Sequence, residues 1–191
     1  MYKNMIQDYK TLYKKCMKGR TILAGVVEDS RGVGFCNLIK NTVLSRIRHP
    51  LKEEAVQLLS KTRDTNLLFW VLAKGEMSRV FRYSESPREH PVLKDFGPLS
   101  KSIYSFYLKT AELDRPVRVD CLGREHAKRA ASILLAVSGH HPGYGLPAPL
   151  IEADNVSKLS EAEIETFHSF ILACTGNIPS VMTLRREQRP F

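Results

Sequence analysis

The sequence predicts an α/β fold, in which helices flank a sheet of short strands, and two patterns carry this prediction. Short runs rich in β-branched and aromatic residues occur at residues 21–27, 103–108 and 117–121. Apolar residues recur at helical spacing over residues 5–17 and 124–138. Strands interspersed with amphipathic helices indicate an α/β domain, and we expect one domain over residues 1–191.

The first two expected elements are a basic amphipathic helix and a strand. Residues 5–17 place apolar side chains on one face and lysines on the other, where they contact DNA phosphates or form a solvated surface. Residues 21–27, T-I-L-A-G-V-V, predict a strand buried on both faces. Glu28 and Asp29 follow it. Acids at a strand end are typical ligand positions in open α/β sheets and also typical turn formers, and we prefer the turn interpretation.

The middle of the chain has weaker signals. Residues 53–59 have helical spacing, and Asp64 is placed to cap the helix that follows. The apolar run of that helix, residues 67–72, is predicted as core in preference to a platform on which bases stack. Residues 78–83 fit an edge strand, and residues 86–98, with three prolines, fit a loop.

The second half predicts a hairpin and then helices. Residues 103–108 and 117–121 are joined by a turn at residues 113–116. Arg118 and Asp120, two apart on a strand, share a face, and we expect a cross-strand ion pair there. The helix at 124–138 turns its small and aliphatic side chains inward, and these are Ala127, Ala130, Ala131, Leu134 and Val137.

A capping box opens the last expected helix. Ser160 and Glu163 have the required spacing, and apolar residues at helical spacing follow to Gly176. His168 lies beside this apolar stripe, and we interpret it as a structural histidine. The basic segment at residues 184–189 is either a free end or an arm that grips a partner.

The composition favours a polyanionic partner. The 191 residues include 29 Lys and Arg against 20 Asp and Glu, so the net charge is +9. This balance is typical of nucleic-acid-binding proteins. Four cysteines, without zinc-site spacing, predict buried thiols in a reducing cytoplasm. The apolar runs are too short to span a bilayer and no signal peptide is evident, so we expect a soluble, cytoplasmic protein.

Residues 143–154, G-Y-G-L-P-A-P-L-I-E-A-D, combine a rigid loop with the start of a helix. The helix buries one side and presents Glu152 and Asp154 on the other. Carboxylates behind a stiff loop in a basic protein suit a divalent-metal site that acts on a phosphodiester. Solvated acids at a capped helix start are the alternative interpretation, and residues 143–154 by themselves favour it.

Four segments together resemble the NurA-domain nucleases, which process DNA ends in prokaryotes. The first is L-A-G-V-V-E-D-S-R at 23–31, and the second is the apolar run at 67–72 followed by Gly75 and Glu76. P-V-R-V at 116–119 and G-L-P-A-P-L-I-E-A-D at 145–154 complete the set. The segments occur in the family's order and cover most of the chain.

The resemblance implies a fold, a chemistry and partners. It implies a partial ribonuclease H-like mixed sheet with helical and hairpin insertions. It also implies a Mn2+-dependent (or Mg2+-dependent) 5′–3′ DNA nuclease in end resection and double-strand-break repair, a homodimer, and a HerA-type hexameric ATPase that translocates DNA. The chain matches the C-terminal half of the family pattern, and the family's early catalytic carboxylates have no counterpart in it. We therefore expect the chain alone to cleave DNA poorly or not at all.

The same resemblance implies the site residues. Many relatives carry Tyr and His where this chain has Leu146 and Asp154. Asp154 is a competent metal ligand in place of the His, Glu152 is a weaker candidate ligand, and Tyr144 is placed to supply the missing phenol. The basic residues expected to hold the DNA backbone are Arg31, Arg46, Arg48 and Arg118. Relatives often carry Lys at the position of Glu28.

Two alternatives from other classes remain open. The first is a non-catalytic module that binds DNA or docks onto the translocase, and the lack of the early carboxylates favours it. The second is a structural protein whose positive charge is incidental. DNA binding that is absent or insensitive to salt would support the second alternative.

Overall fold

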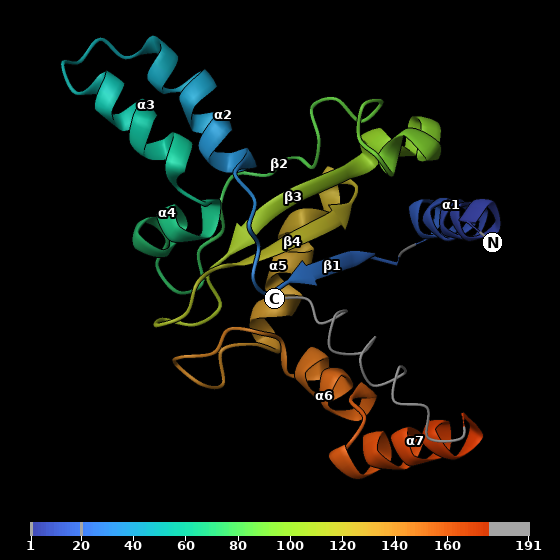
Figure 1. The fold of residues 1–191 in the computed structure, drawn as a ribbon. Coiled ribbons are helices and arrows are strands. Elements are labelled where there is room, and N and C mark those ends of the chain that lie inside the picture. Colours follow the sequence, from blue (N-terminus) through green and yellow to red (C-terminus); the bar gives the residue numbers. More distant parts are fainter. Residues whose placement is uncertain (1, 20, 176–191) are drawn as a thin grey trace. The chain divides into compact units, whose positions relative to one another are not determined.

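The computed structural model describes residues 2–19 and 21–175. The chain forms two compact units, Met1–Pro149 and Leu150–Phe191, and each is described by itself. The first unit holds the sheet and the helices up to α5, and the second holds most of α6 and α7 (Figure 1). Among the described residues, no helix is long and apolar enough to cross a membrane.

The described strands form an open four-stranded sheet in the order β1-β4-β3-β2. Their bounds are Ala24–Val27 for β1, Phe81–Arg82 for β2, Ile103–Leu108 for β3 and Val117–Leu122 for β4. Every pair is antiparallel. The predicted hairpin of β3 and β4 and the predicted edge strand around β2 are confirmed. The prediction of a mixed sheet is wrong for these strands, because β1 also runs antiparallel to its neighbour β4.

One face of the sheet forms the core with α5, Ala127–Ala136. Phe106, Val119 and Cys121 alternate along β3 and β4 and are fully buried on this face. The alanines predicted to face inward, Ala127, Ala130 and Ala131, pack against them, and small side chains let the helix lie close to the strands. The helix follows a single 3-10 turn, η3, Arg124–His126.

Strand β1 lies at an edge of the sheet. Its residues are half-buried or exposed, and Gly25 has open space on its side-chain face. The prediction of a strand buried on both faces is therefore wrong. An apolar run specifies a strand, but its burial depends on which strands and helices cover it, and β1 has β4 as its one neighbour.

Helices α1, α3 and α4 lie where helical spacing predicts them, whereas α2, η1 and η2 were not predicted individually. Helix α1 packs beside η2, where the Tyr13 and Phe96 rings stack with centroids 5.4 Å apart. Segment η2, a 3-10 helix, occupies part of the stretch predicted as a loop. The bounds are Tyr2–Lys18 for α1, Gly34–Thr42 for α2, Leu44–Arg46 for η1, Lys52–Lys61 for α3, Asp64–Val71 for α4 and Leu93–Ser102 for η2.

Asp64 joins three elements through its buried carboxylate. The residue is 1% exposed. Its Oδ2 and Oδ1 accept hydrogen bonds from the backbone N–H groups of Phe35 (2.9 Å) and Cys36 (2.8 Å), in the first turn of α2. Its Oδ2 also accepts one from the Tyr107 hydroxyl on β3, at 2.9 Å. Asp64 was predicted to cap its own helix; instead it satisfies the free N–H groups of α2, which has no side-chain cap of its own.

The groups around Asp64 stay protonated. Burial, with the neighbouring Asp64 carboxylate, raises the pKa of the Cys36 thiol to about 12. Burial also raises the pKa of Tyr107 above its usual value. Cys36 is therefore an inert thiol. The prediction of four buried cysteines holds for Cys16, Cys36 and Cys121 and is wrong for Cys174, which is exposed on α7.

Helices α6, Ala148–Ser157, and α7, Glu161–Cys174, make up the described part of the second unit. The predicted capping box is confirmed: Ser160 Oγ accepts from the Glu163 N–H, and Glu163 Oε2 accepts from the Ser160 N–H at 2.8 Å. These bonds to Ser160 hold the pKa of Glu163 below its usual value. The basic segment at residues 184–189 and the expected helix end at Gly176 lie outside the described residues.

The Asp64 network predicts a large stability loss for Asp64→Ala. The substitution leaves one buried N–H group, one partly buried N–H group and one buried hydroxyl without their acceptor. Because each such group costs about 1–3 kcal/mol, we expect the free energy of unfolding to fall by about 3 kcal/mol or more. Urea denaturation measures this change, with the exposed Glu89→Ala as a control expected to stay within about 0.5 kcal/mol of the wild type. A loss below 1 kcal/mol for Asp64→Ala would contradict the account.

Candidate functional site

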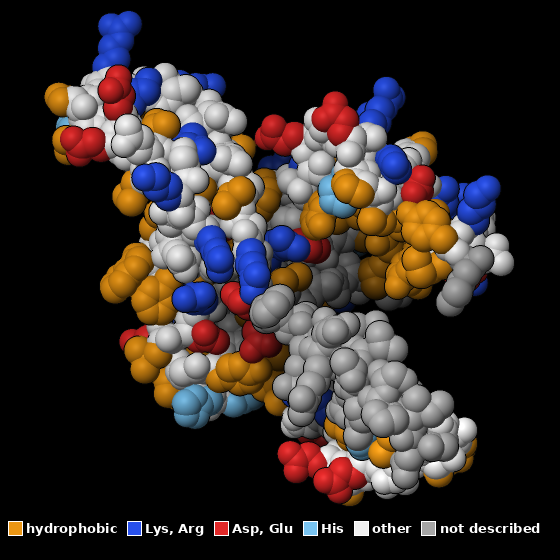
Figure 2. Space-filling model, in the orientation of Figure 1, with side chains coloured by type: hydrophobic (Ala, Val, Ile, Leu, Met, Phe, Trp, Pro, Cys, Tyr) orange, Lys and Arg blue, Asp and Glu red, His pale blue; other side chains and the backbone are white. Residues whose placement is uncertain are grey.

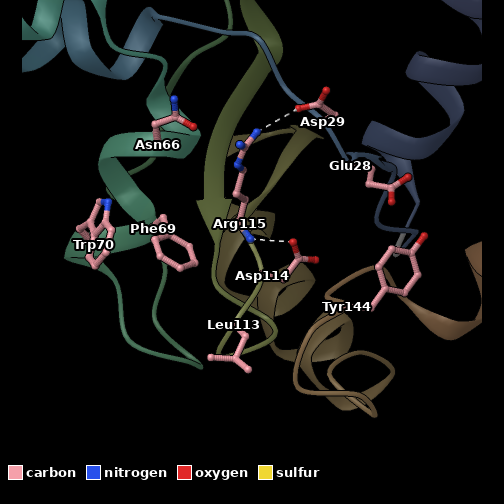
Figure 3. Close-up of a pocket in the computed structure, with 9 residues that line it drawn as sticks. All are labelled: Glu28, Asp29, Asn66, Phe69, Trp70, Leu113, Asp114, Arg115 and Tyr144. Carbon is pink, nitrogen blue, oxygen red and sulfur yellow. Dashed lines mark hydrogen bonds and ion pairs between the residues drawn. The ribbon is translucent and has the colours of Figure 1, made fainter.

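A pocket of about 730 Å3 opens where β1 ends, beside α4 and the β3–β4 turn (Figure 3). Four segments of the first unit contribute to it: the end of β1, helix α4, the β3–β4 connection and the loop after α5. Its lining residues are Glu28, Asp29, Asn66, Phe69, Trp70, Leu113, Asp114, Arg115 and Tyr144.

Asp114 holds the loop that carries Tyr144. Its Oδ2 accepts a hydrogen bond from the Gly145 N–H at 2.7 Å, and its Oδ1 accepts one from the Arg115 N–H, also at 2.7 Å. Thr110 Oγ1 donates to the Gly145 carbonyl at 2.6 Å. Both backbone polar groups of Gly145, its N–H and its carbonyl, are therefore hydrogen-bonded to side chains. A Cβ at this position would collide with Thr110 Oγ1. The loop is fixed, and the Asp114 carboxylate is used in fixing it.

The pocket has two chemically different walls. Phe69, Trp70 and Leu113 form an aromatic and aliphatic side, and Figure 3 shows Glu28 and Tyr144 across the pocket from Trp70. Asp29 and Arg115 approach within 3.8 Å, and both side chains are more than half exposed. An ion pair this exposed contributes little to stability, so both groups stay open to a ligand. The arrangement suits a flat ring on one side and polar groups on the other.

Helix α4 departs from its prediction as core. Leu68 is buried at 1% exposure, whereas Trp70 is 85% exposed and Val71 is 62% exposed. The Phe69 and Trp70 rings meet edge to face with centroids 5.1 Å apart. The run is apolar on every side of the helix, so its pattern does not tell which side faces the sheet. The core interpretation is wrong for Trp70.

A buried lysine supports the aromatic wall from below. Lys109 is 2% exposed, and its Nζ lies 3.7 Å from the centre of the Phe69 ring, a cation–π contact. Burial lowers the pKa of Lys109, and the nearby Asp114 and Glu112 oppose that shift. Nζ also donates to the Phe69 carbonyl at 3.4 Å. These contacts fix Phe69 and leave the neighbouring Trp70 to face solvent.

Arg118 and Asp120 share the polar face of the sheet, as predicted. Arg118 Nη2 donates to Asp120 Oδ2 at 3.0 Å, along β4 and not across strands as expected. The cross-strand partner of Asp120 is Ser105, which donates at 2.6 Å. Arg118 Nη1 also donates to Ser30 Oγ at 3.3 Å. The guanidinium and the carboxylate therefore already have protein partners.

The other arginines predicted to contact DNA are exposed. Arg31 lies in the β1–α2 connection, and Arg46 and Arg48 lie in the α2–α3 connection. On the face shown in Figure 2, Lys and Arg side chains gather beside α2 and near the end of β1, with acidic side chains next to them. The surface there is mixed in charge.

The predicted metal ligands lie on α6 in the second unit. Glu152 and Asp154 are both exposed, and Asp154 forms an ion pair with Lys158 one turn later. Tyr144 lines the pocket of the first unit. The structure thus gathers Tyr144, Glu28 and Asp29 at one site, and it describes Asp154 and Glu152 separately from them.

The donor set does not fit a complete metal site. Over residues 2–19 and 21–175, no group of three or more His, Cys, Asp or Glu side chains lies close enough to hold one ion. Of the acids at the pocket, Asp114 is occupied by two backbone N–H groups. Hard divalent cations need several oxygen ligands at once, and no three acidic side chains of the described residues lie close enough together to supply them.

Comparison with protein families identifies the chain. An α/β domain with a net charge of +9 and a pocket lined by acids and aromatics is consistent with a protein that works on nucleic acid. Residues 2–159 match the NurA domain, so the chain belongs to the NurA-domain family, and the resemblance stated from sequence is confirmed. This membership implies a nuclease-type function in DNA end processing, and nucleases of this family are metal-dependent. Neither curated proteins nor solved structures gave a match.

Sequence analysis missed most of the pocket. It singled out Glu28 and Asp29 as ligand or turn positions, and the structure shows them in a bend and at the pocket. It did not single out Asn66, Leu113 or Asp114. The turn at residues 113–116 was the available signal, but its partner, the Gly145 loop, lies about thirty residues later, as the Asp114 contact shows.

The clamp on Gly145 predicts that Gly145→Ala destabilises the pocket. The new methyl group would collide with Thr110 Oγ1 and come within 3.3 Å of Asp114 Oδ2, so the loop must move. We expect a loss of about 1–3 kcal/mol of unfolding free energy. Gly143→Ala is the matched control, because its nearest neighbours, in His141, lie at an ordinary 3.4 Å or more. Equal stability of the two variants in urea denaturation would contradict the clamp.

Proposed function

We propose that this chain is part of a metal-dependent DNA nuclease that acts in end resection and double-strand-break repair with a HerA-type translocase. The NurA-domain match over residues 2–159 carries this proposal. The net charge of +9 supports it, because DNA is a polyanion. In this proposal the protein works as a homodimer and uses Mn2+ or Mg2+.

Asp154 and Glu152 are the proposed metal ligands on this chain. Both are carboxylates on the exposed surface of α6, the hard oxygen donors that Mn2+ and Mg2+ prefer. The ion pair of Asp154 with Lys158 is exposed at 56% and 66%, so a cation can displace the lysine at small cost. Tyr144 is proposed as the phenol that assists catalysis. The active enzyme then needs further carboxylates. This follows from the interpretation that the chain corresponds to the C-terminal half of the family pattern, which lacks the early catalytic carboxylates.

A non-catalytic module that binds DNA or docks onto the translocase is the second candidate. The absence of a three-ligand cluster among the described side chains favours it. The nuclease and a DNA-binding module both need DNA contacts, whereas a module that only docks onto the translocase does not. We assign phosphate contacts to Arg31, Arg46 and Arg48, which are exposed, and to Arg118, whose release from Asp120 is required first.

The first test is cleavage of labelled single- and double-stranded DNA with Mn2+ or Mg2+. We expect little or no cleavage by this chain alone, because the ligands it supplies are too few, and DNA binding that weakens as salt rises. The variants are Asp154→Ala and Glu152→Ala, with Glu165→Ala on α7 as a matched exposed acid. Fluorescence anisotropy measures binding in the same buffers.

The outcomes separate the candidates. Cleavage that is lost in Asp154→Ala and kept in Glu165→Ala would show a working site on this chain and overturn the docking module. Salt-dependent binding without cleavage would support an incomplete nuclease or a docking module. No binding at low salt would overturn the DNA-binding roles of both candidates and leave only docking onto the translocase.

Trp70 is the proposed contact to an unpaired base. Its indole is 85% exposed beside the polar Asn66 and next to Phe69 in the same pocket. Stacking on a base is worth about 1–3 kcal/mol, so we expect Trp70→Ala to weaken binding of single-stranded DNA about 5- to 150-fold. Trp70→Phe keeps a ring and should retain most of the affinity.

The control removes another exposed apolar side chain, away from the pocket. Leu58 on α3 is 68% exposed, and Leu58→Ala should leave binding unchanged. Blunt duplex DNA, whose bases are paired, should respond less to Trp70→Ala than single strands do. A uniform loss on both substrates would contradict base stacking.

A further inference from the structure

Helix α1 has an apolar stripe that its own unit does not cover. Ile6 and Cys16 are buried, at 6% and 7% exposure, so one edge of the helix belongs to the core. The stripe beside this edge is nearly half exposed. Its members are Met5 at 46%, Tyr9 at 47% and Leu12 at 42%. Tyr2, at 48%, continues the row, but its hydroxyl donates to Asp95 in η2 at 2.7 Å and so keeps a contact with its own unit. In Figure 2, hydrophobic side chains lie exposed over α1.

The spacing of this stripe is that of a helix–helix seam. Its exposed positions 2, 5, 9 and 12 follow one another at intervals of three, four and three residues, and the row ends before Cys16, which is buried in the chain's own unit. This is the a/d pattern of a two-helix coiled coil. A helix that only covers a core needs no such second row, and α1 already meets its own core through Ile6 and Tyr13. The stripe therefore fits another helix.

The charges beside the stripe select the orientation of that helix. Asp8 precedes the seam residue Tyr9 by one position, and Lys15 holds the equivalent place seven residues later, before the buried Cys16. In an antiparallel pair of identical helices, these flanking positions face each other. When Tyr9 lies opposite the partner's Leu12, Asp8 lies opposite the partner's Lys15. The two-fold axis repeats this pair, so both acids meet both lysines.

A parallel pair lacks this match. There, the position of Asp8 would face the partner's Tyr13, which is committed to the core beside Phe96. The remaining lysines do not oppose self-pairing, because Lys3, Lys10 and Lys14 share another side of the helix, away from the stripe. The same lysine side makes DNA a poor occupant for the apolar stripe.

We propose that two copies of this chain associate through α1 as an antiparallel, two-fold symmetric helix pair. The Tyr9 and Leu12 layers lie at its centre, and the Asp8 and Lys15 ion pairs lie along its border. This inference specifies the interface of the homodimer in the proposed function and rests on that part of it. It depends on no nuclease step. The seam is short, so the dimer is in equilibrium with monomer.

The test is sedimentation velocity of the whole chain over a range of concentrations, in low salt and without DNA or metal. We expect the wild type to pass from monomer to dimer. Tyr9→Lys places two positive charges in the seam and should leave a monomer at every concentration. Circular dichroism checks that each variant stays folded.

Charge reversal tests the register. Asp8→Lys and Lys15→Asp each turn two attractive pairs into repulsive ones and should raise the dimer dissociation constant at least about fivefold. The double variant restores opposite charges and should return to within about twofold of the wild type. Lys10→Asp, on the other side of α1, is the control and should leave the dissociation constant unchanged.

Three results would overturn the proposal. They are a wild type that is monomeric at every concentration, a dimer that survives Tyr9→Lys, and single charge reversals that the double variant does not rescue. Because mass is measured without DNA, failure here leaves the cleavage assay untouched. Conversely, if the nuclease proposal fails, a dimer that the double charge variant restores would still establish α1 as an interface.

Discussion

The buried carboxylate of Asp64 is the constraint on which the pocket depends. It is the first residue of α4, it satisfies two N–H groups of α2, and it accepts from Tyr107 on β3. One side chain thus fixes two helices against the sheet. Since α4 carries Phe69 and Trp70, and since the Asp64 N–H bonds the Gly32 carbonyl just after β1, the network sets the separation between the aromatic wall and the acids. Asp64 therefore affects the pocket indirectly, by holding α2, α4 and β3 in position.

A second buried network uses charges that the sequence suggested for DNA. Arg118 bonds Asp120 and Ser30, and its guanidinium lies 5.5 Å from the centre of the Tyr83 ring. Both charged side chains are about one-fifth exposed. Breaking a pair this buried costs more than breaking a surface pair. In the proposed function, the phosphate contacts therefore go first to the exposed arginines in the loops. The polar face of the sheet orders Ser30 and the β1–α2 connection.

The sequence predicted the elements whose pattern is local. Helix α1, the β3–β4 hairpin, the inward alanines of α5 and the Ser160 capping box all follow from spacing within one segment. Long-range choices were not predictable in this way. Asp64 selects N–H groups 28 and 29 residues away instead of its own helix, and Asp114 selects Gly145. The burial of β1 and the exposure of Trp70 likewise depend on neighbours that no local pattern identifies.

Trp70 and the α1 stripe, two exposed apolar surfaces of the first unit, call for different occupants. Trp70 projects singly from α4, among carboxylates and an amide, where one flat, polar-edged ring fits better than an aliphatic helix. The α1 stripe is a row about one side chain wide with seam spacing and opposite charges at its border. A base cannot cover such a row, whereas a second α1 can do so along its whole length. Spacing and border charge, more than exposed area, therefore distinguish the proposed base contact at Trp70 from the proposed self-association face on α1.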